Sequence, residues 1–169
     1  MSLKKNSIAF VIIGALGTLG HFLYEWSGDN RLVGYFFSVN ESTWEHLKLL
    51  FFPTVIYSVF EYFLIKEKPE NYIPAVVISV ICGMLTIITL FYTINGILGY
   101  NVDFINISIY FISIISMLVK KNKLIKNQLF SVNIAHWFFL LVGLIISLLF
   151  IFWTYNPPSL GIFTPPVMS

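Results

Sequence analysis

Five apolar runs, each long enough to form a membrane-spanning helix, dominate this 169-residue chain. They cover residues 7–27, 41–65, 72–94, 102–119 and 129–154. About 20 helical residues cross a hydrocarbon core of ~30 Å, and only helices or closed barrels satisfy their backbone groups there. Barrel strands would alternate in polarity over about ten residues, whereas these runs are continuous. We therefore predict an all-α polytopic membrane bundle of five transmembrane helices.

The composition favours the same fold class. The chain is 57% hydrophobic and 11% charged, while charged residues supply about a quarter of a typical soluble domain. We expect one membrane domain over residues 1–169, which ends in a proline-rich tail at 155–169. The net charge of +2 is too small to indicate a nucleic-acid partner. The expected partner is the lipid bilayer.

The basic residues predict the orientation of the bundle in the membrane. With the amino terminus in the cytoplasm, eight of the ten basic residues fall on the cytoplasmic side, as the positive-inside rule requires. They are Lys4, Lys5, Lys66, Lys68, Lys120, Lys121, Lys123 and Lys126. The carboxyl terminus is then outside. Abundant Lys, Ile, Asn and Phe are typical of an AT-rich bacterial genome, which indicates a bacterial cytoplasmic membrane.

Local signals refine two of the spans. Pro53 falls inside the second run, where it should kink the helix and free a carbonyl one turn earlier, near Leu49. Asn40 is the predicted N-cap of that helix. In the first run, Gly14 and Gly17 share a face that should point inward, because small residues let membrane helices approach closely.

Ionisable side chains gather toward the outer ends of the first two spans. An ionised group in a span costs at least about 2.5–3.5 kcal/mol, so each one needs a reason to be there. His21 and Glu25 lie four residues apart on one helical face, as do Glu41 and Glu45. His46 is rotated about 100° from Glu45. One helix therefore cannot aim both Glu45 and His46 at the same ion.

One interpretation of this outer cluster is a binding site reached from outside. The candidate ligands are His21, Glu25, Glu41, Glu45 and His46. His21, Glu25 and either Glu45 or His46 would hold a divalent metal or a cationic ligand. Zinc accepts such histidine and carboxylate ligands and can activate a water for hydrolysis.

The other interpretation of the outer cluster is structural. Glu41 would then be an anion at a helix terminus, where the helix dipole favours it. Glu45 and Lys48 would form an ion pair at the membrane interface, and His21 and Glu25 a buried hydrogen-bonded pair that bridges helices. The sequence leaves both interpretations open.

A second polar pair, Glu61 and His136, falls in the inner half of the spans. We predict a neutral hydrogen-bonded pair between two helices. A proton relay or a substrate contact is the functional alternative.

Three segments resemble a known family: HFLYEWSG at 21–28, NESTWEHLKLLFFP at 40–53 and NPPSLGIFTPP at 156–166. Together they resemble small bacterial integral-membrane proteins of unknown function with an NES-x-WEH-x-K-x-x-F-x-P signature. The resemblance implies that His21, Glu25, Asn40, Glu41, Ser42, Trp44, Glu45, His46, Lys48 and Pro53 belong to this signature. It implies no activity.

Three classes of function fit these features, and whether the chain is an enzyme is left open. A ligand-binding, metal-binding or accessory role ranks almost level with a metal-dependent membrane hydrolase. A small transporter ranks third. Five helices are few for a self-contained carrier, so transport would require a homo-oligomer or a partner membrane subunit.

The predicted orientation can be tested with a reporter fused to the carboxyl terminus. We expect the reporter to lie outside the cytoplasm, because an odd number of spans separates it from the cytoplasmic amino terminus. A reporter active only in the cytoplasm would contradict the predicted sidedness, and a matching fusion in the lysine-rich loop after residue 119 should give the opposite result.

Overall fold

A computed structural model describes residues 3–166 of the protein, and every regular element in that range is a helix. Five long helices are apolar enough to cross a membrane, which confirms the predicted fold class. They are α1 (Leu3–Trp26), α3 (Thr43–Leu64), α4 (Tyr72–Leu98), α5 (Asp103–Lys126) and α6 (Asn133–Tyr155). A short helix, α2 (Arg31–Gly34), and a 3-10 turn, η1 (Gly161–Phe163), lie outside these spans.

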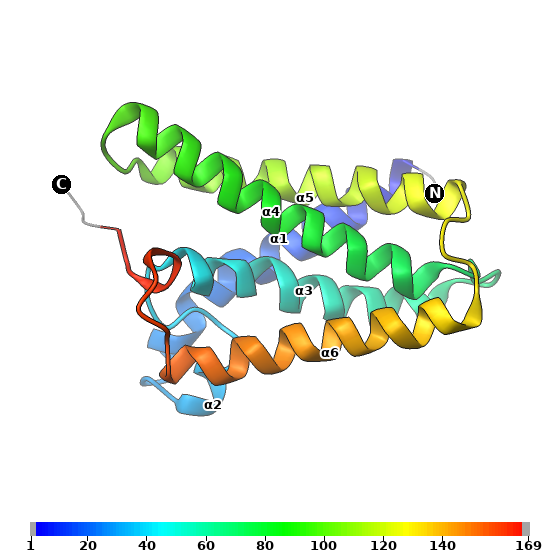
Figure 1. The fold of residues 1–169 in the computed structure, drawn as a ribbon, viewed down its shortest axis with the longest axis horizontal. Helices are drawn as coiled ribbons and strands as arrows, with labels where there is room; N and C mark the ends of the chain where they lie inside the picture. The colour runs from blue at the N-terminus through cyan, green and yellow to red at the C-terminus, as the bar shows by residue number, and fades with distance from the viewer. Residues whose placement is uncertain (1–2, 167–169) are drawn as a thin grey trace.

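The long helices run along one axis, with α3 in the middle (Figure 1). α3 contacts α1, α4, α6 and the turn η1, while α4 packs mainly on α5. In its most apolar stretch α3 is 56% buried, against 11% for α6. The start of α1 and the turn η1 lie at opposite ends of the bundle (Figure 1), which we call the amino-terminal and carboxyl-terminal ends. α3 is therefore the central helix of the bundle.

The helix bounds differ from the predicted runs by several residues, and two of the differences matter for the sites. α5 continues to Lys126, seven residues beyond the apolar run, because this extension is amphipathic and buries Lys121 and Leu124 against the bundle. Residues 28–40, between the first two apolar runs, contain the one-turn helix α2, whose N-cap Asn30 accepts a hydrogen bond from the backbone N–H of Leu32 at 2.9 Å. Hydropathy alone detects neither feature.

Pro53 lies inside α3, as predicted, and the carbonyl of Leu49 one turn earlier has a partner on another helix. The Tyr110 hydroxyl of α5 lies 3.2 Å from the Leu49 oxygen and 3.1 Å from the Ile13 oxygen of α1. A backbone carbonyl left without a donor in an apolar interior is costly. Tyr110 therefore satisfies the carbonyl that Pro53 deprives of its helical donor.

Gly17 allows α1 to reach this point. A Cβ atom at Gly17 would lie 1.9 Å from the Tyr110 hydroxyl oxygen and 2.4 Å from the Leu49 carbonyl oxygen. Neither distance is compatible with a side chain. The predicted inward face of Gly14 and Gly17 is thus the contact face of α1, since both glycines are buried there.

Replacing Gly17 with alanine should destabilise the bundle. The new methyl group must push α1 away from Leu49 and Tyr110, and overpacking of this kind costs about 1–3 kcal/mol. Gly96→Ala is the matched control, because Gly96 lies in α4 with no neighbouring atom within 4 Å of an added Cβ. Thermal unfolding in detergent measures both variants, and equal midpoints for Gly17→Ala and wild type would contradict this account.

Candidate metal centre

Local hydrogen bonds define the start of α3, which lies two residues later than the sequence predicts. The N-cap is Ser42, not Asn40: its hydroxyl accepts from the backbone N–H of Glu45 at 3.4 Å, in extended geometry. Asn40 instead accepts from the N–H of Ser42 at 2.9 Å, and so shapes the loop before the helix. The Ser-x-x-Glu spacing at 42–45 is a capping-box signal that favours Ser42. Glu41 consequently lies outside the helix, where its side chain can reach across.

Glu45 and Lys48 form the predicted ion pair, and the protein buries both side chains. The Lys48 Nζ lies 2.6 Å from Glu45 Oε2, and the two residues are 0% and 2% exposed. Lys48 also donates to the Gly34 carbonyl at 2.8 Å and to the Thr154 hydroxyl at 2.9 Å. A buried charge is tolerated only when paired and fully hydrogen-bonded. This pair therefore joins α3 to α2 and α6.

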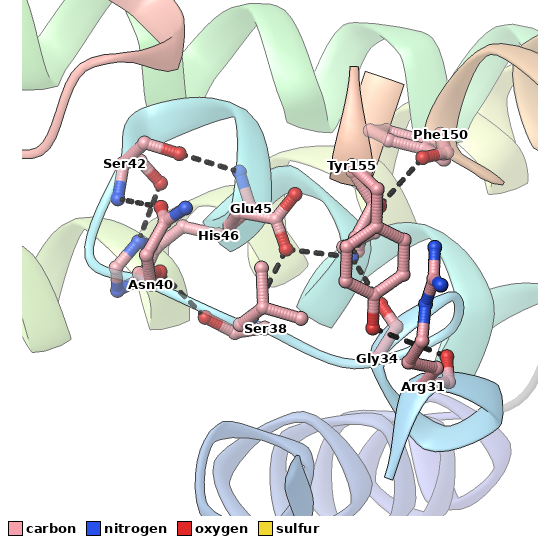
Figure 2. A network of polar contacts seen from close by, with 12 residues as sticks. Arg31, Gly34, Ser38, Asn40, Ser42, Glu45, His46, Phe150 and Tyr155 are labelled. Carbon is pink, nitrogen blue, oxygen red and sulfur yellow. Dashed lines mark hydrogen bonds and ion pairs between the residues drawn. The ribbon is translucent and has the colours of Figure 1, made fainter. Parts of the chain in front are cut away.

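Glu45 also holds the loop that leads into α3. Its Oε2 accepts a hydrogen bond from the Val39 backbone N–H at 3.0 Å, and Ser38 donates to the Asn40 carbonyl at 2.8 Å (Figure 2). In a capping box this glutamate would bond the N-cap residue instead. The sequence left either Glu45 or His46 as the metal ligand on this helix. The Glu45 carboxylate already binds Lys48 and the Val39 backbone.

His46, the other candidate ligand on α3, lies beside His21 and Glu41. The His46 Nε2 lies 3.6 Å from Glu41 Oε2, and the His21 Nε2 lies 3.6 Å from Glu41 Oε1. The two imidazole rings are 5.3 Å apart between centroids. One potential ligand atom from each residue lies within 4.8 Å of the others. Three segments, α1, the loop before α3 and the first turn of α3, therefore meet at one point.

A backbone contact fixes the orientation of His46. Its Nδ1 lies 2.9 Å from the Ser42 carbonyl oxygen, which can only accept, so Nδ1 carries the proton (Figure 2). The Nε2 lone pair is then free to face Glu41. Metal-binding histidines commonly donate their second nitrogen to a carbonyl in this way. The Nδ1 of His21, by contrast, is buried without a hydrogen-bond partner.

Glu25 does not join this group. It is exposed near the end of α1, while His21, four residues earlier, is half-buried and faces Glu41. The predicted pairing of His21 with Glu25 gives way to a contact with a residue 20 positions along the chain. Sequence spacing identifies neighbours on one helix only, so the role of Glu41 depended on the path of the loop.

Glu61 and His136, the predicted inner pair, do not contact each other in the structure. Glu61 forms a buried ion pair with Lys121 and accepts from the Tyr72 hydroxyl at 2.5 Å and the Tyr57 hydroxyl at 3.4 Å. His136 lies elsewhere, along a cavity between the starts of α4 and α6. The sequence placed Lys121 in a cytoplasmic loop. The longer α5 carries it into the bundle, where it becomes the partner of Glu61.

The proline-rich tail folds back onto α3. Phe163 of η1 packs against Trp44 and Trp153, with ring centroids 4.8 Å and 5.5 Å apart. Trp44 and His46 are two residues apart and point to nearly opposite sides of the helix. The tail thus covers α3 away from the histidine pair, and the side chains of His21, Glu41 and His46 remain 30%, 44% and 35% exposed.

These three side chains offer the ligand types of a zinc site. Two imidazole nitrogens and a carboxylate oxygen suit zinc, and three protein ligands leave a fourth position open for water or another ligand. Their partial exposure keeps that position accessible.

The chain matches one described family along almost its whole length. The match is to a family of unknown function, DUF6512, and covers residues 2–168, so the chain belongs to that family. No curated protein and no solved structure matches the chain.

The buried pair gives a stability prediction. Lys48→Met should destabilise the protein by about 3–5 kcal/mol, because it leaves the Glu45 carboxylate buried and unpaired. The double variant Glu45→Gln/Lys48→Met removes both charges and should recover part of the loss. Lys66→Met, at an exposed lysine of the opposite end, is the control and should change stability little. If thermal unfolding ranks Lys66→Met with Lys48→Met, the ion pair does not hold this end together.

Proposed function

We propose that this member of the DUF6512 family is a membrane protein that binds a divalent transition metal, zinc by preference, through His21, Glu41 and His46. The observation that carries the proposal is the convergence of these three side chains from separate segments. Ion pairs of the ordinary kind do not require two histidines on one carboxylate. A metal explains why both imidazoles face it.

The spacing of the donor atoms supports zinc. At metal–ligand distances of about 2.0–2.2 Å, tetrahedral donor atoms lie about 3.3–3.6 Å apart. The two histidine–glutamate separations are both 3.6 Å, longer than hydrogen bonds. The widest pair in the group lies within 4.8 Å, which small rotations of the rings would close. The Ser42 carbonyl supplies the outer hydrogen bond that orients His46.

We infer that the site faces the outside of a bacterial cytoplasmic membrane. The lysines at positions 5, 66, 68, 120, 121, 123 and 126 belong to the amino-terminal end of the bundle, opposite the metal centre. Positive residues are retained on the cytoplasmic side. A metal supplied from outside would reach the half-exposed ligands without crossing the bilayer.

A metal-binding accessory or sensor role is the function that these features support best. Metal-dependent hydrolysis is the second candidate, and one observation favours it: three ligands with an open fourth position are the pattern of catalytic zinc. Bound zinc there would lower the pKa of a coordinated water, and Glu41 would both hold the metal and orient the water. A hydrolase additionally predicts turnover of an ester by the zinc-loaded protein that is lost in His46→Ala.

Zinc titration of the purified protein, after removal of metal with a chelator, tests the proposal. We expect one zinc ion per chain, with an affinity lowered at least about tenfold in His21→Ala, Glu41→Gln and His46→Ala, because each removes one of three ligands. Binding should also weaken in acid, since the imidazoles must lose their protons to bind. Isothermal titration calorimetry and elemental analysis give affinity and stoichiometry.

His136→Ala and Glu25→Gln are the matched controls. His136 is the third histidine of the chain and lies at the opposite end of the bundle, and Glu25 is an exposed carboxylate one turn from His21. Both variants should retain full zinc binding. Equal losses in the controls, or no stoichiometric zinc in the wild type, would overturn the metal centre.

A further inference from the structure

A cavity of about 390 Å³ opens at the amino-terminal end of the bundle, far from the metal centre. It lies between the carboxyl end of α3 and the starts of α4 and α6. Its lining includes Tyr62, Lys68, Glu70, Ser131, Asn133 and His136. The volume is in the range of small-ligand sites, about 300–1,000 Å³. The polar side chains come from three separate segments, so the cavity depends on the tertiary fold.

Two of the lining groups can donate to an anion. The Lys68 ammonium lies over the Tyr62 ring, 4.6 Å from its centroid, which holds the charge at the cavity. His136, in the first turn of α6, is half-buried and presents an imidazole to the same space. Ser131 and Asn133 add a hydroxyl and an amide. Together these groups match the several oxygen atoms of a phosphate.

The charge of this end of the bundle favours an anion as well. Among the residues whose side chains the structure describes, this end holds seven lysines, at positions 5, 66, 68, 120, 121, 123 and 126, and three glutamates, at positions 61, 67 and 70. Lys121 and Glu61 neutralise each other in their buried pair. The lysines that remain still outnumber the glutamates, so a mobile anion is attracted to the cavity. Basic pockets between transmembrane helices on the cytoplasmic side commonly bind anionic headgroups.

The surroundings of the cavity suit a lipid better than a soluble ligand. α6 is the least buried of the long helices, and in the turns beside His136 it exposes Ile134 and Trp137, which are 78% and 72% accessible. At the carboxyl end of α3, Phe63 and Leu64 are 75% and 82% accessible. These apolar side chains offer contact to acyl chains while the headgroup sits in the polar cavity.

We propose that this cavity binds the phosphate group of an anionic phospholipid, with Lys68 and His136 as its donors. A headgroup that carries hydroxyls, such as glycerol, also gives the Glu70 carboxylate a donor. Phosphatidylglycerol therefore fits the lining better than phosphatidylcholine, which has no headgroup donor and no net charge. The proposal is independent of zinc binding, because it uses no residue of the metal centre.

Lipid retention measures this site directly. The full-length protein is reconstituted in nanodiscs of phosphatidylglycerol and phosphatidylcholine, extracted into detergent, and its bound lipids are counted by native mass spectrometry. We expect retained phosphatidylglycerol in the wild type and about fivefold less in Lys68→Gln, since one lysine contact near an anionic surface carries roughly that factor. His136→Asn should show a loss in the same direction.

Lys66→Gln is the matched control, because it removes the same charge two residues away, at an exposed lysine outside the cavity lining. It should retain lipid as the wild type does, and equal unfolding midpoints check that all variants fold. Equal loss in Lys66→Gln, or no loss in Lys68→Gln, would overturn the proposal in favour of a diffuse surface charge. Displacement of the lipid by millimolar soluble glycerol phosphate would overturn the proposal of a lipid ligand. The cavity would then be a site for a soluble phosphate ester.

Discussion

The buried contact between Lys48 and Glu45 organises the carboxyl-terminal end of the bundle. An ammonium group is tolerated in an apolar interior only when its donors are used, and those of Lys48 reach Glu45, Gly34 and Thr154. These partners belong to α3, α2 and α6, so a single side chain ties three segments together. Because Glu45 also accepts from the backbone of Val39, the loop that carries Glu41 is held by the same contact.

A second requirement, that every backbone group in an apolar interior finds a partner, explains the contact of α1, α3 and α5. Pro53 removes the helical donor of the Leu49 carbonyl, and Tyr110 supplies another. That replacement needs the three helices to meet closely, which Gly17 permits. The proline, the tyrosine and the glycine are thus parts of one arrangement, although they are far apart in the sequence.

The candidate functional residues lie at the two ends of the helical bundle. Two histidines and a carboxylate gather at the carboxyl-terminal end, on α1, the loop before α3 and the first turn of α3. Lysines and the cavity of His136 gather at the opposite end. The stretch between them is packed with apolar side chains of α3, such as Leu50 and Phe51. The two candidate sites therefore share no residue, and the helices set the distance between them.

The sequence by itself determined the five membrane-length helices, the gathering of lysines at one end and the carbonyl freed by Pro53. These features follow from hydropathy, charge and local backbone chemistry, which act within a few residues. Only the tertiary structure decided that Glu41 and His46 join His21, that Glu45 belongs to Lys48, and that Glu61 pairs with Lys121 rather than His136. Such partners are chosen by where loops turn and how far helices extend, and a periodic pattern along one helix carries no information about either.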